Sequence, residues 1–235
     1  MAPSSHALIG PDGFQLRGTA MSRVDGFSDV VFGFALTLLV VSLEVPKTYG
    51  ELHELIHGFL PFAVSFTLLL TVWYAHYFFF RRYGLHDVGT IVLNAMLLFV
   101  VLFYVYPLKF MFGLFIGQVA GYVDANQLKP HEGTELMVVY GLGFTVIYLL
   151  FFALYWNGWR QREELELTPL ERKLTKIYMA DHLTMVAIGL LSCLLAVVLP
   201  LGEAGNAGWV YLLIGVSKWF YGYYGGRTTR SFSSI

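Results

Sequence analysis

Six long apolar segments restrict this chain to one kind of fold. Each holds roughly 20 mostly apolar residues, and a helix of about that length crosses the hydrocarbon core of a bilayer. Their apolar runs are continuous, which excludes the alternating strands of a membrane β-barrel. Only 13% of the 235 residues are charged, against about 25% in an ordinary soluble domain. The sequence therefore predicts an all-α integral membrane protein with six transmembrane helices. The expected spans are residues 23–45, 55–80, 88–116, 135–156, 176–199 and 208–224.

The distribution of basic residues predicts how these helices are oriented. Of the 15 Lys and Arg residues, Lys218 lies within the sixth span and three lie in the outer loops. The remaining 11 lie on the inner side, and such an excess favours the cytoplasmic side. Both termini are therefore expected in the cytoplasm. We expect a flexible N-terminal tail over residues 1–20, a six-helix domain over 21–226 and a C-terminal tail over 227–235. The net charge of −1 argues against a nucleic-acid partner.

Polar residues are expected at one depth near the inner ends of the first three helices. Asp29 lies about six residues into the first span, roughly 9 Å along it at about 1.5 Å per residue. Successive spans cross the membrane in opposite directions. The end of the second span and the start of the third therefore lie at a similar depth near the inner side. The predicted cluster consists of Arg23, Ser28, Asp29, Trp73, His76 and Asn94. One interpretation is a structural link between helices, and the other is gating or proton sensing by a histidine beside a carboxylate.

The outer part of the first span carries a different pattern. Phe34, Thr37, Val41 and Glu44 recur at intervals of three or four residues, which places them on one helical face. Around the axis of an oligomer, this face would form an apolar constriction with an acidic mouth, and acidic rings favour cations. The alternative is that the face contacts lipid or another helix.

The start of the first span contains a specific motif. Arg23, Phe27, Ser28 and Asp29 form the pattern R-x-x-x-F-S-D, which runs directly into the apolar segment. This motif resembles the transmembrane protein 175 family, the endosomal and lysosomal potassium channels and their prokaryotic relatives. The resemblance covers residues 23–107 and includes further positions of the second and third spans. These positions are Trp73, His76, Arg81, Arg82, Asn94 and Pro107.

The resemblance implies a prokaryotic, single-repeat potassium channel in the cell membrane. Four copies of the six-helix unit would surround a pore lined by the first helix of each copy, with potassium as the permeant ion and no cofactor. The tightest layer would be Phe34, with Thr37 and Val41 above it, and Glu44 would concentrate cations at the mouth. The family usually has Ile or Leu at the first position, so Phe34 either closes the pore more tightly or shares the layer with Leu38.

The sequence leaves two other functions open. His53, Glu54 and His57 match the H-E-x-x-H pattern of a zinc metalloprotease, and the same side offers acidic and histidine side chains as a third ligand. These candidates are Asp124, His131, Glu132 and Glu135. The second possibility is a secondary transporter, although the chain shows no convincing internal repeat of the kind that transporters often contain.

Overall fold

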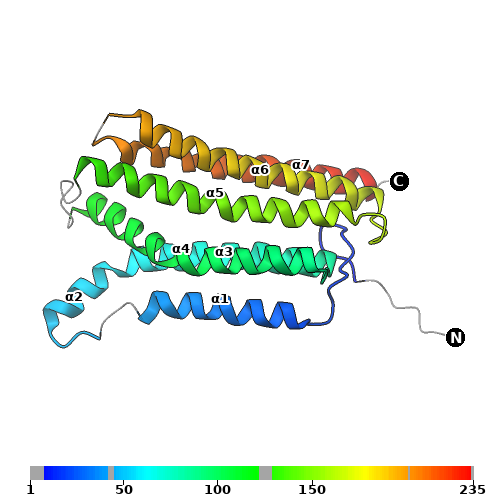
Figure 1. Ribbon diagram of the computed structural model, residues 1–235, viewed down its shortest axis with the longest axis horizontal. Coiled ribbons are helices and arrows are strands. Elements are labelled where there is room, and N and C mark those ends of the chain that lie inside the picture. Colours follow the sequence, from blue (N-terminus) through cyan, green and yellow to red (C-terminus); the bar gives the residue numbers. More distant parts are fainter. Residues whose placement is uncertain (1–7, 42–44, 122–128, 201, 234–235) are drawn as a thin grey trace.

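The computed structural model describes residues 8–41, 45–121, 129–200 and 202–233, and it is almost entirely helical. The long helices lie side by side along one axis (Figure 1). The elements are α1 (Arg23–Val41), α2 (Tyr49–His57), α3 (Phe59–Tyr83), α4 (Val88–Ala120), α5 (Pro130–Arg160), α6 (Pro169–Val198), the 3-10 helix η1 (Ala204–Leu212) and α7 (Leu213–Ser233). We call the end of the bundle that carries both termini the inner end, and the opposite end the outer end. The prediction of an all-α fold is confirmed.

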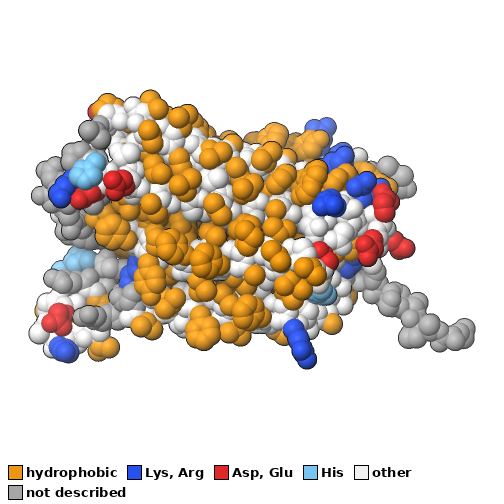
Figure 2. Space-filling view, viewed as in Figure 1, with side chains coloured by type: hydrophobic (Ala, Val, Ile, Leu, Met, Phe, Trp, Pro, Cys, Tyr) orange, Lys and Arg blue, Asp and Glu red, His pale blue; other side chains and the backbone are white. Residues whose placement is uncertain are grey.

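In the part of the chain that the structure describes, five helices are long and apolar enough to cross a membrane, namely α1, α3, α4, α5 and α6. The helix α7 is not among them, since it carries Lys218, Arg227 and Arg230 within its 21 residues. Charged side chains lie mainly toward the two ends of the face in Figure 2, and apolar side chains cover the length between them. This distribution fits a bundle whose middle is surrounded by lipid.

Local sequence explains most of the helix ends. The hydroxyl of Thr168 accepts from the amide of Glu171, whose carboxylate accepts in turn from the Thr168 amide, so the two residues form a capping box. Ser22 and Asp25 make the same reciprocal pair before α1. Two expected spans differ from the structure. The second is preceded by a separate short helix that ends at His57, and the sixth is replaced by η1 followed by α7.

The long helices form two groups that meet along α4 and α5. In the first group α1, α3 and α4 pack against one another, and in the second α6 packs against α5, η1 and α7. A continuous apolar core runs through both groups from Phe32 and Leu39 of α1 to Leu154 of α5 and Ile177 of α6. Helices that are far apart in the sequence therefore share one apolar core.

The N-terminal segment, residues 8–20, departs from the expected flexible tail because it is folded onto the inner end. Phe14 is 0% exposed, and its ring packs edge-on against that of Tyr83 at 5.4 Å. The amide of Gly18 donates to the carbonyl of Arg81 at 3.1 Å, and a Cβ at this position would lie only 2.3 Å from the carbonyl oxygen of Phe80. Glycine is therefore required for this close approach.

The C-terminal end of the chain also differs from the expected tail over residues 227–235. The helix α7 continues through Ser233, and Thr228 is buried. The hydroxyl of Thr229 donates to the backbone carbonyl of Asp12 at 3.1 Å. This contact joins α7 to the N-terminal segment, which explains why the helix continues beyond its apolar part.

Candidate functional site

The face of α1 predicted from periodicity is exposed in the single chain. Phe34 is 63% exposed and Val41 is 76% exposed, and Thr37 lies between them on the same side. The opposite face of α1 is buried and contributes Phe32 and Leu39 to the core. A helix that buries one face and exposes a large aromatic side chain on the other needs lipid or further protein against it.

The residues along this face differ in what they can offer an ion. The hydroxyl of Thr37 donates to the carbonyl of Phe34 within the same helix at 2.8 Å. Because its hydrogen is used in this way, the lone pairs of the oxygen remain available to a cation. Leu38 is half-buried and packs against the core. Glu44 lies outside the described residues.

A buried hydrogen-bond network joins α1, α3 and α4 near the inner end. The side-chain amide of Asn94 donates to the hydroxyl of Ser28 at 2.9 Å, and its carbonyl oxygen lies 2.7 Å from Nε2 of His76. All three side chains are almost fully buried. The predicted meeting of these three residues is thus present, and each satisfies polar atoms that would be costly to bury alone.

The other members of the predicted cluster lie apart from this network. Trp73 donates from its indole nitrogen to a carboxylate oxygen of Asp29 at 2.9 Å, which adds a second link between α3 and α1. Phe27 and Arg23 are exposed, and within the part of the chain that the structure describes Arg23 has neither an ion pair nor a side-chain hydrogen bond. The single chain therefore forms one three-residue network and one separate pair.

Two ion pairs that sequence analysis did not identify connect the N-terminal segment to the helices. Arg17 makes two hydrogen bonds of 2.9 Å to the carboxylate of Glu171, which is only 1% exposed. Arg82 pairs with Asp12 at 2.6 Å and also donates to the hydroxyl of Tyr178 at 3.0 Å. These pairs fix the segment that leads directly into α1.

A third polar contact at the inner end holds the start of α4 against α5. Asp87 caps α4 by accepting from Thr90, and it also accepts from the side chains of Asn157 and Gln161. Burial alone would raise the pKa of Asp87, but the hydrogen bonds from Thr90, Gln161 and Asn157 lower it to about 2. The carboxylate is therefore ionised at any ordinary pH.

The structure offers no support for the zinc pattern. His53 and His57 lie one helical turn apart on α2, with ring centres 4.4 Å apart. Among the described residues, however, no three His, Cys, Asp or Glu side chains are arranged to hold a metal ion. Asp124, one of the candidate third ligands, lies outside those residues.

Comparison with known proteins identifies relatives of the region that contains this site. The family model described as "Endosomal/lysosomal potassium channel TMEM175" matches residues 23–104. The matched region runs from the start of α1 into α4, so it includes the exposed face of α1, the buried network and the pair of Trp73 and Asp29.

Similarity to characterised proteins extends over nearly the whole chain. A potassium channel of Marivirga tractuosa is 36% identical over 211 residues, which is 85% of this chain and 85% of the relative. A potassium channel of Chamaesiphon minutus is 33% identical over 93 residues, 36% of this chain and 46% of the relative. The crystal structure of a variant of the potassium channel MtTMEM175, in complex with a nanobody–MBP fusion protein, matches with a TM-score of 0.81 and 33% identity. That match covers 94% of this chain and 100% of the other.

Proposed function

Because this chain belongs to the family of the endosomal/lysosomal potassium channel TMEM175, we propose that α1 of each of four copies lines its central pore. The chain is a membrane protein and a potassium channel, not an enzyme. The channel unit comprises residues 21–226, with the part of α7 before Arg227 in the sixth span and both termini in the cytoplasm. The excess of basic residues at the inner end supports this orientation.

The observation that carries the proposal is the exposed face of α1. In a tetramer, Phe34 forms the narrowest layer, and Thr37 and Val41 form the layers on its outer side. The exposure of Phe34 and Val41 in the single chain leaves these side chains free to face a shared axis. An apolar ring of this kind stops ions by excluding water, which makes Phe34 the closing layer.

Two neighbours of Phe34 complete this part of the pore. Thr37 presents an oxygen whose hydrogen is already donated to the helix, so a ring of four such oxygens can replace part of the water shell of a potassium ion. Leu38 packs sideways against the core, so it supports the Phe34 layer from behind. Potassium moves down its electrochemical gradient, and no cofactor takes part.

The inner polar contacts hold α1 in register. Ser28, Asn94 and His76 link α1 to α3 and α4 within one chain, and the pair of Asp29 and Trp73 adds a second link. The guanidinium of Arg23 and the ring of Phe27 are exposed and are placed to contact a neighbouring copy. The motif residues therefore position the pore helix, and Phe34, Thr37 and Val41 line the path of the ion.

Purified protein in planar bilayers under a potassium gradient tests this proposal. We expect a potassium current in the wild type and a larger current in Phe34→Ala, because the closing ring is removed. Thr37→Val keeps the side-chain shape without the oxygen and should reduce the preference for potassium over sodium. The matched control is Phe99→Ala, since Phe99 is an exposed phenylalanine of α4, a helix that is not proposed to line the pore.

The outcomes separate the parts of the proposal. No current from either the wild type or Phe34→Ala would contradict conduction by this chain. A current that changes equally in Phe34→Ala and Phe99→Ala would place the pore elsewhere than along α1. A molar mass other than four times 26.5 kDa for the purified complex, with detergent subtracted, would rule out the tetramer.

A further inference from the structure

The outward face of α7 combines apolar, aromatic and basic side chains in a single row. Val216, Trp219, Tyr223, Arg227 and Arg230 are spaced by three or four residues, so they share one side of the helix. All five are exposed. The row changes from apolar to aromatic to basic toward the inner end, which is the order of a bilayer from its middle to its surface.

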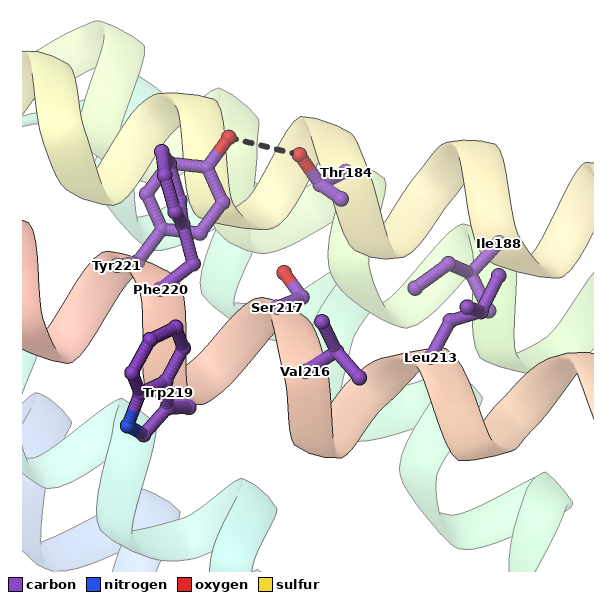
Figure 3. Close-up of a pocket in the computed structure, with 8 residues that line it drawn as sticks. All are labelled: Thr184, Ile188, Leu213, Val216, Ser217, Trp219, Phe220 and Tyr221. Carbon is purple, nitrogen blue, oxygen red and sulfur yellow. Dashed lines mark hydrogen bonds between the residues drawn. The ribbon is translucent and has the colours of Figure 1, made fainter.

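The apolar part of this row borders a groove between α6 and α7 (Figure 3). The groove has a volume of about 370 Å³ and is lined by Thr184, Ile188, Leu213, Val216, Ser217, Trp219, Phe220 and Tyr221. On one side it is closed by the hydrogen bond between Thr184 and Tyr221. The small side chain of Ser217 leaves the space open, and its buried hydroxyl has no hydrogen-bond partner among the described residues.

A second hollow lies on the same helix at the inner end. It has a volume of about 320 Å³ and is lined by Gly222, Tyr223, Gly226, Arg227 and Arg230. A Cβ at Gly222 or Gly226 would meet nothing within 4 Å, so the glycines leave room beside the two arginines. Within the described part of the chain, neither Arg227 nor Arg230 forms an ion pair or a side-chain hydrogen bond.

We propose that the two hollows form one binding site for an anionic phospholipid. The phosphate lies between Arg227 and Arg230, because guanidinium groups bind phosphate oxygens through paired hydrogen bonds. An acyl chain runs along the row into the groove beside Ser217. The ten-residue step along the helix from Ser217 to Arg227 spans about 15 Å, which is half of the roughly 30 Å hydrocarbon core and thus the depth of one leaflet.

The contacts of Lys218 leave the two arginines as the groups that recognise the lipid. Lys218 pairs with Asp181 of α6 at 2.5 Å, so its charge is matched within the protein. No described residue matches the charge of Arg227 or Arg230, so an external anion is free to pair with them. The proposal rests on the six-span arrangement proposed above, since α7 must face lipid, but it does not depend on which helix lines the pore.

Trp219 reports directly on this site because it lines the groove. The protein is reconstituted in phosphatidylcholine vesicles in which either phosphatidylglycerol or phosphatidylcholine carries brominated acyl chains that quench tryptophan fluorescence. The signal of Trp219 is the difference between the wild type and Trp219→Phe. We expect half-maximal quenching at a mole fraction about 25-fold lower for the anionic lipid, since two basic side chains at a membrane surface contribute about fivefold each.

Three variants test the assignment. Arg227→Ala with Arg230→Ala should abolish the preference, whereas the matched pair Arg160→Ala with Lys173→Ala removes two exposed charges from α5 and α6 and should retain it. Ser217→Leu fills the groove without changing charge and should weaken quenching by both lipids. If the double arginine variant does not fold, two measurements still test the proposal. They are the preference of the wild type for the anionic lipid and the loss of quenching in Ser217→Leu.

Other results would overturn the proposal. Equal quenching by the two lipids would mean that the face is only exposed to bulk lipid, and equal loss in both double variants would mean that general surface charge attracts the lipid. Quenching by neither lipid would show that protein, such as another copy of the chain, covers the groove. Potassium flux measured in the same vesicles shows separately whether the channel itself works.

Discussion

The inner and outer ends of the bundle are held together by different kinds of contact. At the inner end, charged groups join elements far apart in the sequence, as Arg17 does with Glu171 and Arg82 with Asp12. At the outer end, neutral hydroxyl groups join neighbouring helices, as in the hydrogen bond of 3.2 Å from Ser192 of α6 to the carbonyl of Ala207 in η1. The bundle is therefore cross-linked most strongly where the N-terminal segment enters it.

The same difference runs along α1. Its side-chain hydrogen bonds to other helices, among the described residues, come from Ser28 and Asp29, both near its start. Farther out, Phe34 and Val41 are exposed and the helix is held by apolar packing on its opposite face. This arrangement suits a channel, because a helix fixed at one end can change the width of the pore at the other without losing its register.

The largest expected effect comes from removing the charge pair between the N-terminal segment and α6. Arg17→Ala leaves the Glu171 carboxylate buried without its partner, and the loss of one member of a buried pair lowers stability by about 3–5 kcal/mol. Because Arg17 is partly exposed, we expect the lower end of that range. The apparent melting temperature of the purified protein in detergent measures it, with Arg160→Ala as the control. Equal melting temperatures for the two variants would contradict the importance of this pair.

A smaller loss is expected from the buried network of α1, α3 and α4. Asn94→Ala removes the hydrogen bonds that the Asn94 side chain makes to His76 and Ser28. The loss of these buried partners lowers the free energy of unfolding by about 1–3 kcal/mol. Two controls sharpen the comparison. Ser65→Ala removes a buried hydroxyl whose hydrogen bond lies within α3, and Tyr104→Phe removes one hydrogen bond from the middle of α4 to α5. Both should change the melting temperature less.

The same variant distinguishes the two interpretations of His76. If the network is structural, Asn94→Ala lowers the melting temperature while the pH dependence of the potassium current is unchanged. A shift in that pH dependence with an unchanged melting temperature would instead favour proton sensing by His76.

How far the sequence predicted this molecule depended on how local each signal was. The capping residues Thr168 and Glu171 lie three positions apart, and the exposed face of α1 repeats every three or four residues, so both could be predicted. The network of Ser28, His76 and Asn94 could be predicted because a membrane fixes the depth of each span, even though its members are far apart in sequence.

The N-terminal segment was not predicted because its partners are distant and the membrane does not constrain them. Arg17 and Glu171 are separated by 154 residues, and Phe14 stands as a single large aromatic among polar neighbours, without any periodicity. Nothing local in the sequence showed that the turn at Asp12 and Gly13 packs against α6 and α7. The division between η1 and α7 was missed for a related reason, since both parts are apolar enough to pass for one span.

The smallest expected effect is the loss of charge at Asp87, whose side chain is partly open to water and therefore gains less from its partners. Because its pKa in the folded protein is lowered to about 2 from an ordinary value of 3.8, its stabilising contribution is fully present above about pH 4. It is lost as the pH falls toward about 2.

Asp87→Asn keeps a side chain that can cap α4 but removes the negative charge to which Asn157 and Gln161 donate their hydrogen bonds. The difference in melting temperature between the wild type and Asp87→Asn should therefore stay constant from neutral pH down to about pH 4 and shrink below it. A difference that disappears near pH 6 would contradict the assignment of this contact between α4 and α5 to the charge of Asp87.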